Sequence, residues 1–120
     1  DLGGADLREA RLQGVNLAAA RLAGANLERA LVAGNLVGAD FSAARLARAD
    51  LSGANLKEAR FTGADLQRVN LTGCNLYGAD LTDAQLTRAV LRRANLRRAR
   101  LDGAVTDGAV FEEALGIPPR

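Results

Sequence analysis

The sequence predicts an all-β solenoid in which four five-residue sides close a square coil of 20 residues, with just under six coils stacked along one axis. Two observations predict it. A five-residue unit repeats along nearly the whole chain: a small residue, a polar residue, Leu or Phe, and two variable positions, as in the stretch 49–73. Eighteen of the 20 Leu residues lie at the third position of this unit, here called the centre. A fixed short period of this kind indicates a repeat architecture.

The period of five fits neither a helix nor a flat strand. On an α-helix, a five-residue step turns by about 140°, which would spread the centres around the whole helix. On a strand, an odd step sends successive centres to opposite faces. A chain that turns a corner every five residues keeps all centres pointing to one axis. The small residue two positions before the centre is mostly Ala, which fills the space between columns of Leu. Each coil is then stabilised by its neighbours.

The repeating pattern A(D/N)LXX, seen in Ala54–Leu56 and Ala64–Leu66, resembles that of the pentapeptide repeat family. The resemblance covers Asp1 to about Glu113. It implies a right-handed quadrilateral parallel β-helix with a Leu, Phe and Ala core over residues 1–113. It is specific for the fold and much less specific for function.

The two ends differ from the repeats between them. Residues 114–120 are predicted to form a C-terminal cap or tail, with Leu115 and Ile117 folding over the last coil and Pro118-Pro119 ending the ladder. The chain begins at Asp1 inside a repeat, so we expect a processed chain or a piece of a longer protein. An uncapped N-terminal end exposes strand edges, and self-association through this end is one expectation that follows.

One residue is missing from the register between 34 and 35. The unit Ala30–Gly34 is followed directly by Asn35-Leu36. We expect a tightened corner at Gly34–Asn35, with the coil below unchanged. A tolerated deletion and a hinge or recognition notch are both open interpretations.

Stacking residues that are 20 apart, or 19 across the deletion, predicts two polar columns. Side-chain amides can donate and accept along a stack, and the amide column comprises Asn16, Asn35, Asn55, Asn75 and Asn95. Opposite charges on neighbouring strands stabilise a sheet, and the column of alternating charge comprises Asp1, Arg21, Asp40, Arg60, Asp80 and Arg100. Phe41 and Phe61 are centres on this second face and should stack inside.

Corners are predicted two positions after each centre, where Gly recurs. A type II turn needs a positive φ at its third residue, which Gly adopts without steric penalty. One edge has charged residues there instead, so we expect a different turn at Glu9, Arg29, Arg48, Arg68 and Arg88.

The arginines form the candidate interaction edge. It comprises Arg29, Arg48, Arg68, Arg88, Arg92, Arg93, Arg97 and Arg98. Such an edge could bind phosphates, an acidic protein surface or an anionic membrane. The alternative is a solvated edge, partly paired with Glu28, Glu58, Asp83 and Asp102. Tyr77 is the one tyrosine and no other aromatic side chain is expected outside the core, which disfavours single-strand nucleic-acid binding.

No enzyme constellation is present in the sequence. There is no His, which removes the commonest general base and metal ligand. Cys74 lies at the small inward position, where we expect a buried core residue and not a nucleophile. We therefore predict no enzyme activity, no cofactor, no metal site and no small-molecule substrate. The sequence has neither an apolar run long enough to span a membrane nor a signal-peptide pattern, which favours a cytoplasmic location over export.

The predicted function is a non-catalytic structural or protein-interaction module that presents rigid flat faces. Its partner would be another protein or another domain of a longer chain. The family resemblance implies an alternative, because some members mimic DNA and protect type II topoisomerase (gyrase) from quinolones. That mimicry needs an acidic surface, which Arg interrupts here. Basic-edge binding to nucleic acid or an anionic membrane is the third hypothesis.

Overall fold

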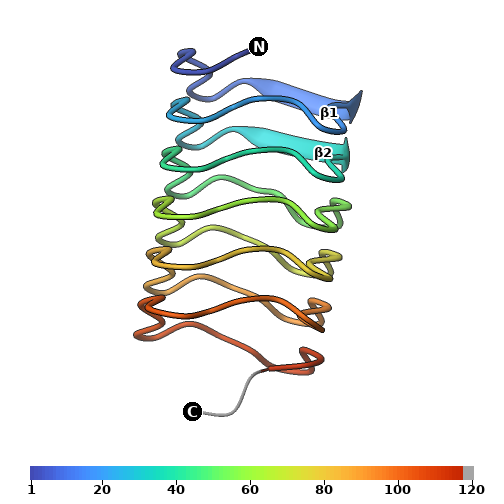
Figure 1. The fold of residues 1–120 in the computed structure, drawn as a ribbon, viewed down its shortest axis with the longest axis vertical. Helices are drawn as coiled ribbons and strands as arrows, with labels where there is room; N and C mark the ends of the chain where they lie inside the picture. Colours follow the sequence, from blue (N-terminus) through green and yellow to red (C-terminus); the bar gives the residue numbers. More distant parts are fainter. Residues whose placement is uncertain (118–120) are drawn as a thin grey trace.

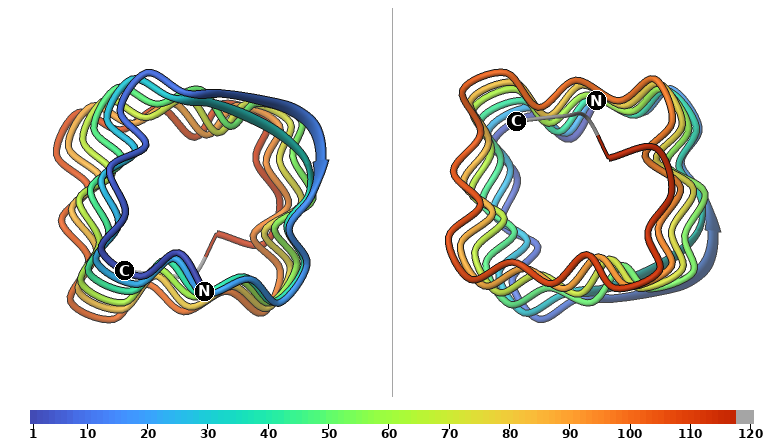
Figure 2. Two further views of the ribbon diagram at one scale, coloured as in Figure 1. Left: turned by 90° about the horizontal axis from the view of Figure 1, so that it is seen from above. Right: turned by 90° about the horizontal axis from the view of Figure 1, so that it is seen from below.

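The computed structural model describes residues 1–117 and is a right-handed quadrilateral β-helix (Figure 1). The coils stack along the long axis of a body measuring 35 × 22 × 19 Å, and the end views in Figure 2 show a four-sided outline. Two extended strands, β1 (Arg11–Asn16) and β2 (Leu31–Asn35), pair in parallel. Elsewhere, isolated parallel bridges join each side of a coil to the same side of the coils above and below it. Within residues 1–117, no helix has the length and apolarity needed to cross a membrane.

Where Asn or Asp precedes the centre in the middle coils, all five backbone N–H groups of a repeat period have partners, as the residues around Leu56 illustrate. Asn55 N–H donates to Gly34 O in the preceding coil at 3.0 Å. The N–H groups of Leu56 and Glu58 donate to the following coil, each at 2.8 Å. Ala59 N–H closes the corner on Leu56 O at 3.0 Å, and Lys57 N–H donates to the Asn55 side chain at 3.3 Å. A buried N–H without a partner is costly, so this pattern explains why the unit can repeat through the interior of the stack.

The core is a stack of centres with small residues between them. Every buried residue described is hydrophobic, and Leu22, Leu56 and Leu96 are completely shielded from solvent. Burying a side chain of this size contributes about 1.5–3 kcal/mol. The rings of Phe41 and Phe61 stack with centroids 5.0 Å apart and an interplanar angle of 4°, which confirms the predicted internal stack.

The deletion is absorbed by a bulge between β1 and β2. Leu12 pairs with Val32 and Val15 with Gly34, so two residues of β1, Gln13 and Gly14, oppose the single residue Ala33. Figure 2 shows this corner of the outline as a smooth extended segment. The expected tightened corner is therefore wrong, because the chain stays extended through the break. The next coil continues in register, since Asn35 pairs with Asn55.

Gly34 is required at this bulge by its backbone conformation and by its close contact with β1. Its φ is +132°, whereas the corner glycines Gly53 and Gly73 have φ of +73° and +69°. A Cβ atom added to Gly34 would overlap with Val15 O. No side chain fits there, so the deletion depends on Gly at this position.

Part of the predicted C-terminal cap, residues 114–117, lies within the described structure. Leu115 pairs with Asn95 and so continues the regular ladder, and its side chain is 45% exposed. Ile117 is 44% exposed. The cap over residues 114–120 therefore stays a prediction, although Leu115 itself holds a regular bridge position. Pro118-Pro119 lie outside the described residues.

Replacing Gly34 with Ala should destabilise the protein more than the same change at a corner. Gly53→Ala is the matched control, because its added Cβ has no neighbour within 4 Å, and it should cost about 1–2 kcal/mol for the left-handed φ alone. Gly34→Ala should cost at least about 2 kcal/mol more, because backbone of β1 must also move. Urea unfolding monitored by circular dichroism measures both. Equal losses of stability would contradict the role given to Gly34.

Candidate interaction surface

Where Asn or Asp precedes a centre, its side chain accepts a hydrogen bond from the backbone of its own unit. Asn75 Oδ1 accepts the N–H of Tyr77 at 3.1 Å, and Asp80 Oδ1 accepts the N–H of Thr82 at 3.0 Å. Side chains of Asn and Asp commonly form this turn with the backbone two residues on. The same contact recurs at Asp1, Asp6, Asn16, Asn26, Asn35, Asp40, Asp50, Asn55, Asp65, Asn70 and Asn95.

The residues of the amide column are aligned through their backbones, and only one contact joins their side chains. Its members pair in sequence along the stack, and they are Asn16, Asn35, Asn55, Asn75 and Asn95. Among the described residues, the one amide–amide hydrogen bond runs from Asn75 Nδ2 to Asn55 Oδ1 at 3.4 Å. The expected continuous amide ladder is largely replaced by local contacts, because the amide oxygens accept N–H groups of their own units.

The column of alternating charge makes no close ion pairs within the described residues. Arg21, Asp40, Arg60, Asp80 and Arg100 follow one another along the stack. Hydrogen bonds from Ser42 lower the pKa of Asp40, and Arg60 and Arg21 add a smaller electrostatic contribution. Hydrogen bonding from Thr82 likewise lowers the pKa of Asp80, with Arg100 contributing less. The attraction between neighbours in this column is therefore weaker than the local hydrogen bonds.

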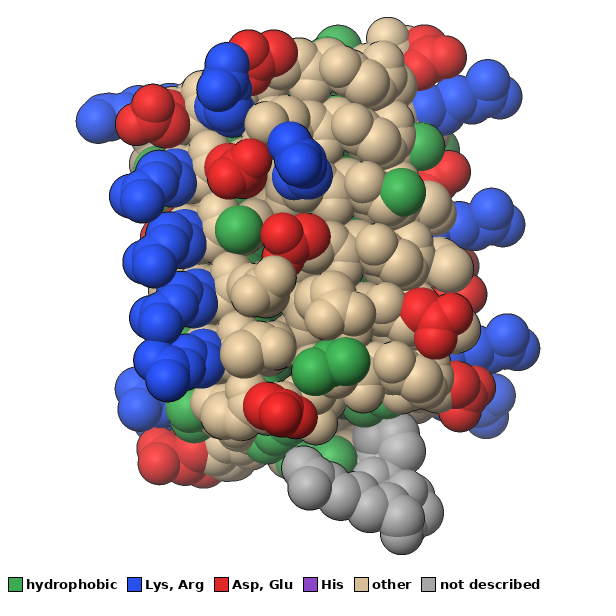
Figure 3. Space-filling model, turned by 90° about the vertical axis from the view of Figure 1, so that its left-hand side faces the viewer, with side chains coloured by type: hydrophobic (Ala, Val, Ile, Leu, Met, Phe, Trp, Pro, Cys, Tyr) green, Lys and Arg blue, Asp and Glu red, His purple; other side chains and the backbone are tan. Residues whose placement is uncertain are grey.

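Arg29, Arg48, Arg68 and Arg88, here called the arginine column, lie at successive corners of one edge. Hydrogen bonds from Arg29 to Ala47, from Arg48 to Gln67 and from Arg68 to Thr87 stack these corners, and Figure 3 shows a line of blue Lys or Arg side chains down the left-hand edge of the solenoid. Their φ values are +60°, +61°, +57° and +59°. The expectation of a different turn is wrong: Val69 N–H closes the corner on Leu66 O at 3.1 Å, as Ala54 N–H does on Leu51 O at 3.0 Å beside Gly53. An L-residue in this conformation costs about 1–2 kcal/mol, a penalty that Gly avoids.

The remaining arginines of the candidate edge lie at other corners. Arg93 and Arg98 follow Arg88 at the next two corners of the same coil, each with φ of +59°. Arg92 and Arg97 precede them. Arg92 Nε lies 4.0 Å from Glu112 Oε1, and Arg93 Nε lies 3.5 Å from Glu113 Oε1. The eight arginines therefore do not form one patch, and no ion pair joins any of them to Glu28, Glu58, Asp83 or Asp102 within residues 1–117.

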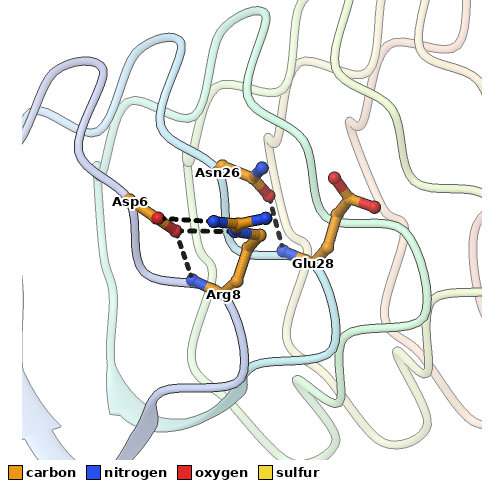
Figure 4. A network of polar contacts seen from close by, with 4 residues as sticks. All are labelled: Asp6, Arg8, Asn26 and Glu28. Carbon is orange, nitrogen blue, oxygen red and sulfur yellow. Dashed lines mark hydrogen bonds and ion pairs between the residues drawn. The ribbon is translucent and has the colours of Figure 1, made fainter.

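A third ion pair lies in the first coil, next to the start of the arginine column. Arg8 Nη2 is 2.8 Å from Asp6 Oδ2, and Figure 4 shows the two side chains meeting in a forked contact. The hydrogen bonds from Arg8 lower the pKa of Asp6 to about 2. In the next coil Asn26 accepts the N–H of Glu28 at 3.1 Å, and the Glu28 carboxylate points away from that contact. Arg8 is thus neutralised within its own unit.

A shallow hollow lies on the side of the solenoid that carries the amide column. It is lined by Lys57, Asn75, Tyr77 and Asn95, and this part of the surface is here called the tyrosine face. Its volume is about 290 Å³. Lys57 Nζ lies 5.9 Å from the centroid of the Tyr77 ring, within the range of a cation–π contact. Sequence analysis did not identify this site. The spacing contained the signal, since Lys57, Tyr77 and Arg97 are 20 residues apart and so occupy equivalent positions in successive coils.

Cys74 belongs to the core. Its thiol donates to Leu51 O at 2.8 Å, and burial raises its pKa to about 12. A thiol with this pKa is almost wholly protonated near neutral pH and is a poor nucleophile. Among the described residues, no three His, Cys, Asp or Glu side chains come together as a metal site would require.

The model of the pentapeptide repeats matches eight copies of the repeat over residues 1–31, 35–73 and 74–112. The chain belongs to the pentapeptide repeat family. The first interruption in this match, at residues 32–34, coincides with the deletion and with Gly34. No curated protein matches the sequence.

Two solved structures show the same solenoid. Rfr23, a pentapeptide repeat protein from the cyanobacterium Cyanothece 51142, is 33% identical with a TM-score of 0.74, over 77% of this chain and 64% of Rfr23. A trypsin-treated variant of QnrB1, a plasmid-mediated fluoroquinolone resistance protein, is 21% identical with a TM-score of 0.86, over 93% of this chain and 58% of QnrB1. This chain therefore covers 58–64% of the length of these two proteins, and at 21% identity the likeness to QnrB1 concerns the fold alone.

Two substitutions at Asp80 distinguish the local turn from ionic stacking. Asp80→Asn keeps the oxygen that accepts Thr82 N–H and should cost less than about 0.5 kcal/mol at pH 7, whereas Asp80→Ala should cost about 1 kcal/mol. Because the pKa of Asp80 is lowered on folding, its contribution is present above the ordinary Asp pKa and is lost as the pH falls below it. Urea unfolding at pH 7 and at lower pH provides the measurement. Equal losses for the two variants, both reduced by salt, would instead indicate stacking of charges.

Proposed function

We propose that this chain is a non-catalytic protein-interaction module, a rigid scaffold whose outer faces carry different chemistry. The tyrosine face is the observation that carries the proposal. It combines a half-buried aromatic ring, a cation against that ring and the side-chain amides of Asn75 and Asn95 in a single shallow hollow. Tyr is among the residues that most often dominate the binding energy of protein interfaces.

The rigidity of the scaffold supports the same function. The side chains of Asn75 and Asn95 accept N–H groups of Tyr77 and Arg97, which fixes the backbone on which Tyr77 is presented. Beneath them the core is filled by fully shielded residues such as Leu76 and Leu96. A surface that is already ordered loses little conformational entropy on binding.

Protection of gyrase from fluoroquinolones is the second candidate function. The observation that favours it is the fold shared with QnrB1 at a TM-score of 0.86. The exterior favours it less, because Arg21, Arg60 and Arg100 separate the acidic residues of the alternating column. The formal charge of the chain is +2, whereas imitation of DNA needs a continuous acidic surface.

Photo-crosslinking tests the interaction module directly. A photoreactive residue at Val37, in the same column as Lys57 and Tyr77, should form an adduct with a protein in an extract of the source organism. The same residue at Thr62, which is exposed on a different face, is the matched control. The purified partner should bind Tyr77→Ala at least about tenfold more weakly, as expected when an aromatic anchor is lost, and Thr62→Ala normally.

Two outcomes would contradict this proposal. Identical adducts from both positions would mean that the tyrosine face has no special role, as would unchanged affinity of Tyr77→Ala for the partner. Inhibition of gyrase supercoiling by the purified chain, or protection of gyrase from a fluoroquinolone, would favour the second candidate.

A further inference from the structure

The arginine column is a part of the surface where the chain accepts two destabilising features together. All four arginines adopt a left-handed backbone conformation, a strain that they share with corners such as Glu58 and Asp83 and that the glycine corners avoid. Each arginine is also exposed and lies directly over the next one along the stack. Arg48 N–H, for example, donates to Gln67 O at 2.9 Å, which places Arg48 and Arg68 at adjacent corners. Like charges placed opposite one another on neighbouring strands repel.

Nothing within the described residues offsets this repulsion through a close ion pair. The three ion pairs there join Arg8 to Asp6, Arg92 to Glu112 and Arg93 to Glu113. The Asp50 carboxylate flanks the column but accepts the N–H of Ser52 at 3.0 Å. The guanidinium groups of the arginine column therefore keep their capacity for paired hydrogen bonds to an external anion.

From this uncompensated row of charge we propose that the arginine column binds an acidic α-helix of a partner protein, lying parallel to the solenoid axis. The inference rests on the proposed interaction function and assigns it a second surface and a class of partner. Its geometric basis is the match between the spacing of the arginines along the solenoid and the spacing of carboxylates along a helix. Neighbouring coils are about 4.8 Å apart, so the four arginines span about 14 Å.

An α-helix matches this pitch and an extended chain does not. Carboxylates at positions i, i+3, i+7 and i+10 of a helix lie on one face and span about 15 Å, since each residue rises 1.5 Å. On an extended strand, four carboxylates on one face span about 20 Å. Three of the four side chains that precede the column, Ala47, Gln67 and Thr87, are uncharged and no longer than Gln, so they leave room for a rod-shaped partner, and only Arg29 follows a carboxylate, Glu28.

Nucleic acid fits the same row less well. The positions beside the column carry no aromatic side chain on which a base could stack, and Tyr77 lies on another face. The formal charge of +2 also gives little general attraction for a polyanion. The acidic helix is therefore the occupant that the observations favour.

The test uses two helical peptides of identical composition. One carries Glu at i, i+3, i+7 and i+10, and the other spreads the same number of Glu residues around the helix. Fluorescence anisotropy with the purified chain should show that the aligned peptide binds at least about fivefold more tightly, because only this peptide meets all four arginines together. Binding of the aligned peptide should weaken as salt is raised from about 20 to about 150 mM.

Paired variants locate the site. Arg48→Gln with Arg68→Gln should weaken binding about fivefold, whereas Arg21→Gln with Arg60→Gln, which removes the same charge from the alternating column, should change it less than about twofold. Arg48→Gly with Arg68→Gly should weaken binding equally and raise the unfolding midpoint, because Gly relieves the left-handed strain. This last result would show directly that the column reduces stability and serves binding.

Several results would overturn the proposal. Equal binding of the two peptides, or equal losses from the two Gln pairs, would indicate unspecific attraction. A lowered midpoint in the Gly pair would make the column a structural element. The column would be assigned to nucleic acid if the chain bound a short DNA duplex more tightly than the aligned peptide, and if Arg48→Gln with Arg68→Gln abolished that binding. Failure of the peptide assay together with intact crosslinking near Tyr77 would reject this inference and leave the proposed function standing.

Discussion

Hydrogen bonding between neighbouring coils is the constraint on which the rest of this structure depends. In each unit the residue before the centre donates to the coil on one side, and the centre and the corner residue donate to the coil on the other, as Asn55, Leu56 and Glu58 do. This arrangement repeats only if every side has five residues and every corner adopts a positive φ. It also fixes which positions face inward, so the core becomes columns of Leu and Ala. Where one residue is missing, the ladder survives because Gly34 can approach Val15 more closely than any other residue could.

Much of this fold could be predicted from the sequence, because burial forces the centres into a strict period. The same period predicted the stacking of Phe41 on Phe61. The corners were harder to predict, since Arg68 and Gly53 adopt the same turn although only Gly is free of strain there. The contacts within the polar columns were harder to predict for another reason. A sequence shows which side chains are neighbours along the stack, but Asp80 reaches the N–H of Thr82 more easily than it reaches an arginine one coil away.

The uniform core leaves function to the exterior, where the faces differ. The tyrosine face is ordered by the same local hydrogen bonds that weaken the predicted amide ladder, because Asn75 and Asn95 hold the backbone beside Tyr77. The arginine column has the opposite character. It adds like-charge repulsion to a backbone strain that other corners, such as Glu58 and Asp83, also carry. A stable scaffold can carry such a row because its stability is distributed over many equivalent contacts between coils.

Amide hydrogen exchange measured residue by residue tests the central claim most directly. The account predicts protection with a period of five through the middle coils. The N–H groups of Asn55, Leu56, Glu58 and Ala59 should exchange slowly, and the N–H of Lys57, bound only to an exposed side chain, should exchange fastest. Thr62 lies two residues after Arg60, where other units have Asn or Asp, so its N–H lacks the side-chain acceptor and should exchange at least as fast as that of Lys57. Uniform protection within each unit, or a period of two, would contradict the account.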